Sequence, residues 1–167
     1  MSDNPEIIRY SKYPFPKRKY IPGKSVHPRK APHLYQIPEL PQAILTNDKD
    51  SWLKCERYLY AIDLFNYGYW WEAHEILEGL WMRAGRKTEL ALFIQGIIQI
   101  AAGLLKDSQG QGRGAALLST KGLEKLKRQS GFFLGIDVDK FTEDIYCYFS
   151  ETNPLPPRIL LQNSDIS

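Results

Sequence analysis

Apolar residues recur at helical spacing over most of the chain after residue 50. Between Trp52 and Phe65 they fall at steps of three and four residues, as on one face of an α-helix. Asp50 or Ser51 can cap the start of this helix. The same spacing predicts four further helices, so that the five together cover about residues 51–66, 69–83, 89–106, 115–129 and 137–149.

The connections between these helices are short, and one of them carries clear end signals. Gly85 is expected to end the second helix, and Thr88 is expected to cap the third. Short connections favour antiparallel neighbours. The pattern therefore predicts an all-α, up-and-down helical bundle with three long core helices and additional flanking helices.

The N-terminal residues differ from the rest of the chain in composition. Eight prolines lie between Asn4 and Pro41, and each removes a backbone donor and restrains the residue before it. The aromatic residues of this stretch favour packing on the body, and they are also compatible with a homo-oligomer. We expect an extended, basic, Pro-rich arm over residues 1–47 that packs on the body, a helical bundle domain over residues 48–150 and an extended C-terminal tail over residues 151–167.

Length and composition are those of one globular domain. The chain has 167 residues, of which 43% are hydrophobic and 25% charged, so one core is expected and disorder is not. Cys55 and Cys147 lie far apart, which gives no sign of a zinc knuckle or a redox pair. The N-terminus lacks an apolar signal segment, and the most apolar run, Leu90–Leu105, is shorter than the roughly 20 residues of a bilayer span. We therefore expect a cytoplasmic protein with no membrane partner.

Charge is distributed unevenly along the chain. The net charge is +3, and because residues 7–38 contribute +8 with no acidic residue, the remainder sums to −5. Basic and aromatic residues alternate in the arm, and such a segment could contact phosphates and stack on bases. A solvated arm over an acidic body is the preferred interpretation, and a nucleic-acid partner is the alternative. The basic residues are Arg9, Lys12, Lys17, Arg18, Lys19, Lys24, Arg29 and Lys30.

The second predicted helix holds the densest chemistry, in the segment YWWEAHEILEGLW over residues 69–81. At 100° per residue, His74 falls within the apolar face and is expected to be mostly buried. Glu78 lies one turn further on, at the edge of that face. Glu75 lies further round the helix, and Glu72 is expected to point to solvent.

The preferred interpretation of this segment is a polar pocket between the second and third helices. Gln95 and Gln99 lie on the small-residue side of the third helix, where a close neighbour could bring their amides towards an imidazole and carboxylates. Such a pocket either fixes the register of the two helices or holds a small ligand or a partner. The residues assigned to it are Trp71, His74, Glu75, Glu78, Trp81, Gln95 and Gln99.

A divalent metal is the alternative occupant. The zinc-protease motif is excluded, because the position four residues after His74 holds Glu78 instead of a second histidine. The two residues could still act as metal ligands, with His27 or His33 of the arm completing the site. Glu75 would then be the general base of a metal-dependent hydrolase.

Three segments of the chain resemble a known family. The segments FNYGYWWEAHEILEGLW, FIQGIIQIAAGLLK and GRGAALLSTKGLEKL together resemble the bacterial and archaeal family called domain of unknown function 309, over about Leu59–Leu126. The resemblance implies an all-helical fold with a three-helix up-and-down core, and it implies no activity. The family motif falls on Phe65, Asn66, Gly68, Trp71, Glu72, His74, Glu75, Glu78, Trp81, Gln95, Gly96, Gln99, Ala101, Gly114 and Ala115.

Overall fold

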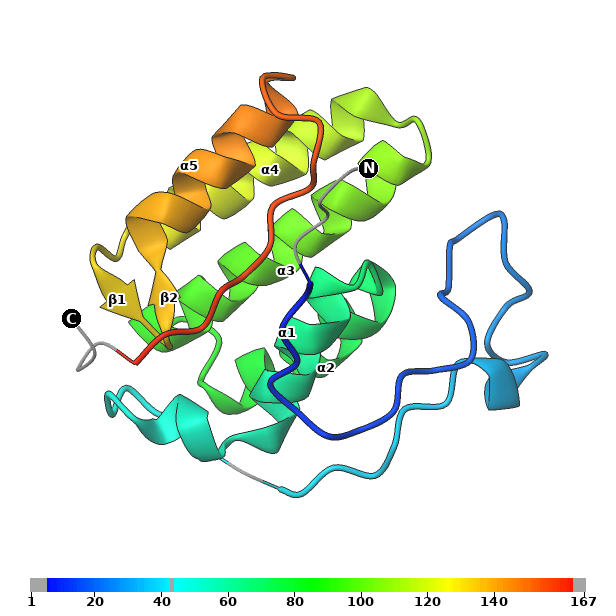
Figure 1. Ribbon diagram of the computed structural model, residues 1–167, viewed down its shortest axis with the longest axis horizontal. Coiled ribbons are helices and arrows are strands. Elements are labelled where there is room, and N and C mark those ends of the chain that lie inside the picture. The colour runs from blue at the N-terminus through cyan, green and yellow to red at the C-terminus, as the bar shows by residue number, and fades with distance from the viewer. Residues whose placement is uncertain (1–5, 43, 164–167) are drawn as a thin grey trace.

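The chain folds into a mostly helical body, with the helices side by side (Figure 1). The computed structural model describes residues 6–42 and 44–163. Successive helices pack on one another from the first to the fourth, and the fifth packs on the fourth, which confirms the predicted helical fold. The elements are η1 (Pro32–Leu34), η2 (Ser51–Lys54), α1 (Glu56–Asn66), α2 (Trp70–Arg83), α3 (Glu89–Ser108), α4 (Gly112–Leu126), β1 (Phe132–Phe133), β2 (Ile136–Asp137) and α5 (Val138–Phe149).

Helix α3 is the central helix of the body. The Thr88 hydroxyl accepts a hydrogen bond from the Ala91 backbone N–H at 3.1 Å, so the predicted cap is present. Within the described part of the chain, α3 is the one helix long and apolar enough to cross a membrane by length and composition. Core helices pass the same test, and α3 packs between α2 and α4. Its position in the core accounts for its apolar composition.

Glycines bring α3 and α4 into close contact. A Cβ atom added to Gly122 would lie 2.7 Å from the Ile100 side chain and 2.9 Å from the Gly96 carbonyl oxygen. The Gly103 backbone approaches the Ala115 carbonyl in the same way. The small-residue side of α3 therefore faces α4, whereas the sequence pattern placed its polar partners on α2.

Two short segments of the fold differ from the sequence prediction. The first helix does not start at residue 51, because Cys55 is extended (φ −90°, ψ 92°) and separates η2 from α1. A hairpin of β1 and β2 occupies the predicted connection before α5. Leu134 and Gly135 both have positive φ angles, 51° and 78°, as a tight two-residue turn requires.

The chain segments at both ends cross the helices. Figure 1 shows the arm (blue) passing in front of α1, and the segment after α5 (red) running back to the hairpin. Three tyrosine hydroxyls of the body donate hydrogen bonds to arm carbonyls: Tyr60 to Pro14, Tyr67 to Ile7 and Tyr69 to Pro16, at 2.8, 2.9 and 3.3 Å. These three contacts bind the arm through its backbone carbonyl groups.

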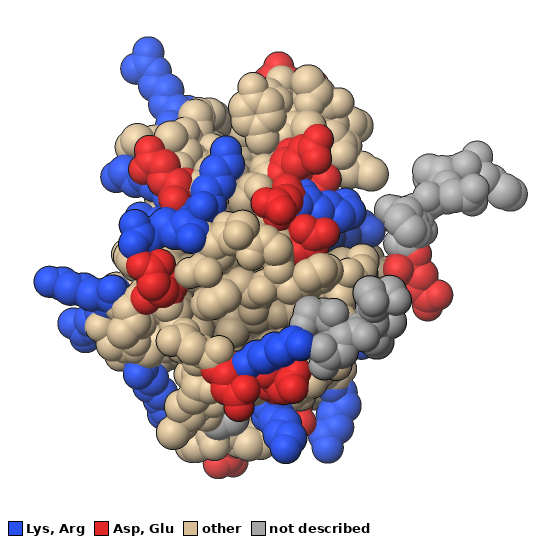
Figure 2. Space-filling view, turned by 90° about the vertical axis from the view of Figure 1, so that its left-hand side faces the viewer, with Lys and Arg blue, Asp and Glu red and all other residues tan. Residues whose placement is uncertain are grey.

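Figure 2 shows the side of the molecule that lies on the left in Figure 1. Basic and acidic side chains are interspersed on this face, with other residues between them. No continuous basic surface is seen there, of the kind that phosphate backbones prefer.

Candidate functional site

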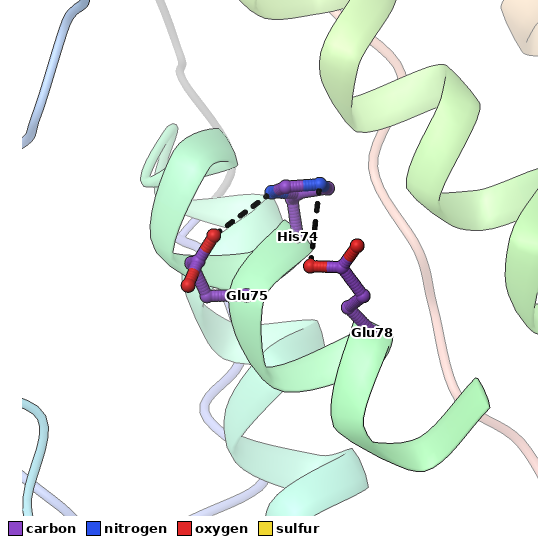
Figure 3. Close-up of side chains that lie close together, drawn as sticks. All are labelled: His74, Glu75 and Glu78. Atoms are coloured by element: carbon purple, nitrogen blue, oxygen red, sulfur yellow. Dashed lines mark ion pairs between the residues drawn. The ribbon is translucent and has the colours of Figure 1, made fainter. Parts of the chain in front are cut away.

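His74 lies on α2 between two carboxylates (Figure 3). Its Nδ1 atom is 3.5 Å from Glu75 Oε1, and its Nε2 atom is 3.9 Å from Glu78 Oε2. The side chains of these three residues are 30%, 43% and 42% exposed, respectively. His74 is therefore less buried than the helical pattern predicted. We call these three residues the His–Glu–Glu cluster.

A pocket of about 430 Å³ opens beside the cluster. It lies where α2, the C-terminal end of α3 and the arm meet, and His74 is the only cluster residue that lines it among those the structure describes. Two indole rings and several aliphatic groups form most of the wall, as is typical of small-molecule sites. The lining residues are Pro22, Gly23, Trp70, Trp71, His74, Ala102, Leu105, Lys106, Gln109 and Gln111. We call this cavity the tryptophan pocket.

Glu72 is fully buried, and the prediction that it points to solvent is wrong. The arm covers it: the Tyr20 backbone N–H donates to Glu72 Oε1 at 2.6 Å, and the Tyr20 ring packs edge-on against Trp71, with 4.7 Å between ring centroids. Its other oxygen, Oε2, has no hydrogen-bond partner within residues 6–42 and 44–163. Burial raises the pKa of the Glu72 carboxyl, while the Tyr20 N–H and the Lys19 ammonium oppose that rise.

The two glutamines of α3 do not join the cluster. Gln99 accepts a hydrogen bond from Lys125 Nζ of α4 at 2.9 Å, in keeping with the small-residue side of α3 facing α4. Gln95 is half-buried, and in the described part of the chain it makes no hydrogen bond to His74 or its carboxylates. Trp81 is also apart, with the Arg86 guanidinium 5.6 Å from the centre of its ring.

The arm histidines lie outside the cluster as well. His27 is exposed, and its Nδ1 atom accepts a hydrogen bond from the Arg29 backbone N–H at 3.2 Å. His33 is exposed in η1. Within the residues that are described, the one group of three potential metal ligands is His74, Glu75 and Glu78, whose ligand atoms all lie within 4.8 Å of one another. In the structure, the third potential ligand beside His74 and Glu78 is therefore Glu75 and not an arm histidine.

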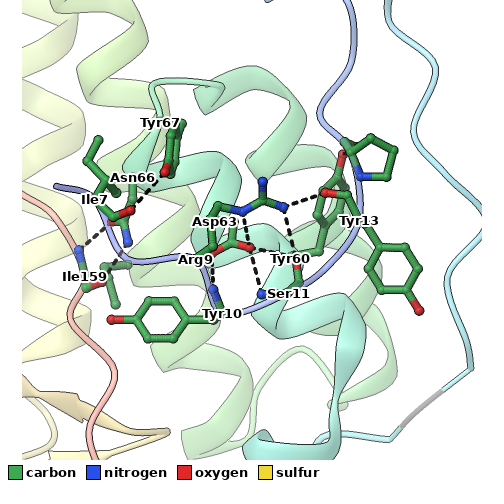
Figure 4. A network of polar contacts seen from close by, with 11 residues as sticks. Ile7, Arg9, Tyr10, Ser11, Tyr13, Tyr60, Asp63, Asn66, Tyr67 and Ile159 are labelled. Atoms are coloured by element: carbon green, nitrogen blue, oxygen red, sulfur yellow. Dashed lines mark hydrogen bonds and ion pairs between the residues drawn. The ribbon is translucent and has the colours of Figure 1, made fainter.

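A second buried carboxylate holds the beginning of the arm (Figure 4). Asp63 of α1 is fully buried and accepts hydrogen bonds from Arg9 Nε at 2.9 Å and from the Tyr10 backbone N–H at 2.8 Å. The Ser11 backbone N–H and hydroxyl donate to it at 2.9 and 2.6 Å. The Arg9 guanidinium also lies 4.1 Å from the centre of the Phe15 ring. Arg9 is therefore engaged within the molecule, which leaves less of the arm's charge for a nucleic acid.

Sequence reasoning missed most of the tryptophan pocket. Ala102, Leu105, Lys106 and Gln109 follow one another at helical spacing on one face of α3 and its end, so this part had a signal. The arm part had none, because the hydrogen bond from Gln109 Nε2 to the Pro22 carbonyl, 2.7 Å long, joins residues 87 positions apart.

The fold and the site define a helical-bundle domain with a His–Glu–Glu cluster beside a tryptophan-walled pocket. Residues 58–118 match the family model described as Domain of unknown function (DUF309), which confirms the resemblance seen in the sequence. The match covers 61 of the 167 residues. The matched segment extends from α1 into α4 and contains the whole cluster. A search of the curated proteins finds no match.

Proposed function

We propose that this domain binds a small organic ligand in the tryptophan pocket. The observation that carries the proposal is the pocket itself, whose volume of about 430 Å³ lies within the range of about 300–1,000 Å³ common for ligand sites. Trp70 and Trp71 supply broad apolar surfaces, and His74 supplies a polar group that can donate or accept a hydrogen bond.

The pocket is bordered by parts of the chain that hold one another in place. Gln109 at the end of α3 bonds to the Pro22 carbonyl, and Glu72 bonds to the Tyr20 backbone. The arm wall is therefore fixed to both helices that form the other walls. A preformed site loses less entropy when it binds a ligand than a site that must first become ordered.

The indole N–H signals of the protein test this proposal. The chain has four tryptophans, and ¹H–¹⁵N spectra of Trp70→Phe and Trp71→Phe assign the two that line the pocket. We expect titration with a collection of small aromatic and aliphatic compounds to shift these two signals in a saturable way. The Trp52 signal should not move, because Trp52 packs against Gly135 of the hairpin instead. If no compound moves the Trp70 or Trp71 signal, the proposal is wrong.

Binding of a divalent metal is the second candidate, and the His–Glu–Glu cluster favours it. Two ligands bound to one zinc ion at about 2.2 Å lie at most about 4.4 Å apart, so the cluster atoms, which lie within 4.8 Å of one another, need only small rotations to share an ion. With Glu75 as a ligand, no general base remains among the three residues. Metal binding thus has more support here than hydrolysis.

Metal content distinguishes this candidate from the ligand pocket. Protein purified without chelator and incubated with zinc should hold one ion, and both His74→Ala and Glu78→Gln should lose it. His33→Ala is the matched control and should retain the ion, since His33 lies outside the cluster. Wild-type protein that stays free of metal would rule the candidate out, and it would leave the tryptophan pocket unaffected.

A further inference from the structure

We infer that the ligand of the tryptophan pocket is a small organic anion with a flat, apolar body, an inference that rests on the proposed function. The anionic group is expected at Lys106, and the flat body between the tryptophan rings and the aliphatic wall. Charge, hydrogen-bond donors and shape each support this class of ligand.

The charge of the lining favours an anion. Lys106 is the one permanently charged residue that lines the pocket in the described structure, and no carboxylate lines it. Glu75 and Glu78 face the ring nitrogens of His74 and are not part of the lining. Lys106 Nζ donates one hydrogen bond to Gln111 Oε1, at 3.2 Å. An ammonium group has three N–H donors, so Lys106 can also bind a ligand oxygen.

Gly114 leaves room for the Lys106 side chain. A Cβ atom added to Gly114 would lie 2.8 Å from Lys106 Cδ, so the lysine stem passes directly over the glycine backbone. Residue 114 does not line the pocket. A larger residue there would displace the ammonium without removing its charge, which provides a test independent of charge removal.

A second donor of the pocket lining has no partner among the described residues. This donor is the Nε1 atom of the lining residue Trp70, which is buried and makes no hydrogen bond in the part of the chain that the structure describes. An indole N–H only donates, and because this atom has almost no exposed surface, a ligand acceptor can pair with it only if the ring turns towards the cavity. Leaving such a group buried and unpaired costs free energy, which a ligand oxygen could recover.

The shape of the wall favours a flat body. Trp70 and Trp71 are consecutive, and Ala102, Leu105 and Pro22 provide the aliphatic surface of the same pocket. Aromatic rings stack or pack edge-on against indoles with a gain beyond that of buried area alone. A planar apolar ring system fits this wall better than a branched polar one.

Three compounds of matched size test the inference: 2-naphthoate, 2-naphthamide and 2-naphthylmethylamine. They share one flat body and carry an anionic, a neutral and a cationic group. In titrations followed by the Trp70 and Trp71 indole signals, we expect 2-naphthoate to bind at least about tenfold more tightly than 2-naphthamide, as a charge-assisted hydrogen bond would give. The amine should bind most weakly.

Variants of the pocket locate the charge effect. In Lys106→Gln and in Gly114→Ala, the preference for naphthoate over naphthamide should fall to within about threefold. Lys121→Gln is the matched control, because Lys121 is exposed on α4 and does not line the pocket. Its preference should equal that of the wild type.

The outcomes separate this inference from the proposed function. Equal binding of naphthoate and naphthamide, or a preference that survives in Lys106→Gln, would overturn the anionic class while the ligand-binding function stands. The same holds if other compounds shift the indole signals and none of the three naphthalenes does. If no compound of any kind shifts them, both the inference and the proposed function are wrong.

Discussion

Substitution of Asp63 by alanine should release the beginning of the arm and destabilise the whole domain. The Asp63 carboxylate is fully buried and accepts four hydrogen bonds, one from Arg9, one from Tyr10 and two from Ser11. Alanine removes all four acceptor contacts. The backbone N–H groups of Tyr10 and Ser11 must then either stay unpaired or leave the surface of α1 for water.

The size of the loss in unfolding free energy depends on whether each donor finds another hydrogen-bond partner after the substitution. Removing one partner of a buried ion pair costs about 3–5 kcal/mol, and an unpaired buried donor about 1–3 kcal/mol. The Arg9 side chain is 32% exposed, so water can solvate it again, and the lower end of these ranges applies. We expect a loss of about 3 kcal/mol, against a total stability of about 5–15 kcal/mol for a typical domain. Asp63→Asn, which keeps one acceptor oxygen, should lose less.

Urea denaturation followed by circular dichroism measures this loss, and limited trypsin digestion measures the release of the arm. Lys12 and Lys17 are exposed on either side of the segment that packs on Tyr60, so cleavage there should accelerate in the variant. Glu124→Ala is the control, since Glu124 is an exposed carboxylate of α4. A change of less than about 0.5 kcal/mol for Asp63→Ala, the usual effect of a surface substitution, together with unchanged cleavage, would refute this account.

Three further substitutions test other contacts. Burial raises the pKa of the Glu72 carboxyl. The carboxyl therefore stabilises the fold below its unfolded-state pKa, and this stability is lost as pH rises through the folded-state pKa. In Glu72→Gln, the free energy of unfolding from urea titrations between pH 4 and 8 should no longer show this decrease. Gly135→Ala would place a Cβ atom 2.7 Å from the Trp52 ring at a φ of 78°, and thermal melts should show a loss of about 1–3 kcal/mol. Asn66→Ala removes buried hydrogen bonds of 2.8 and 2.7 Å to the Ile159 backbone; we expect about 2 kcal/mol of destabilisation and faster hydrogen exchange at the Ile159 amide. For each of the three variants, a value equal to that of the wild type in the stated measurement would contradict the contact on which the prediction rests.

The two helices with the strongest pattern were predictable almost to the residue. The predicted ranges 69–83 and 89–106 correspond to α2, Trp70–Arg83, and α3, Glu89–Ser108. Both have a continuous apolar face, and α3 also has a local cap whose residues lie three positions apart. Such signals are contained in neighbouring residues, so the sequence alone reveals them.

The hairpin and the start of α1 depend on contacts that are distant in the sequence. Leu134 adopts a positive φ that leucine seldom adopts, and its carbonyl accepts a hydrogen bond from the buried Tyr58 hydroxyl at 2.7 Å. The Ile136 strand also pairs with Leu161. No local pattern indicates these partners, so the segment resembled an ordinary connection.

The candidate site was predictable only as far as one helix determines it. His74 and Glu78 lie four positions apart, and Glu75 and Glu78 lie three apart, and side chains at both spacings are neighbours on a helix. The burial of Glu72 was mispredicted for the opposite reason. A polar residue on the polar face of a helix is normally predicted to face solvent. Here the arm covers Glu72, and the arm has no periodic pattern from which this contact could be predicted.

The two buried carboxylates together explain how an irregular arm can form a wall of a binding pocket. Asp63 of α1 binds the arm backbone at Tyr10 and Ser11, and Glu72 of α2 binds it at Tyr20. The two carboxylates are nine residues apart in the chain, as are Ser11 and Tyr20, so two successive helices hold the arm at two separate points. Because these contacts use backbone N–H groups, they fix the path of the arm while most of its basic side chains remain exposed. The second anchor lies next to Trp71, which lines the pocket. Loosening the Glu72 anchor should therefore weaken ligand binding more than loosening the Asp63 anchor, even though Asp63 makes more hydrogen bonds.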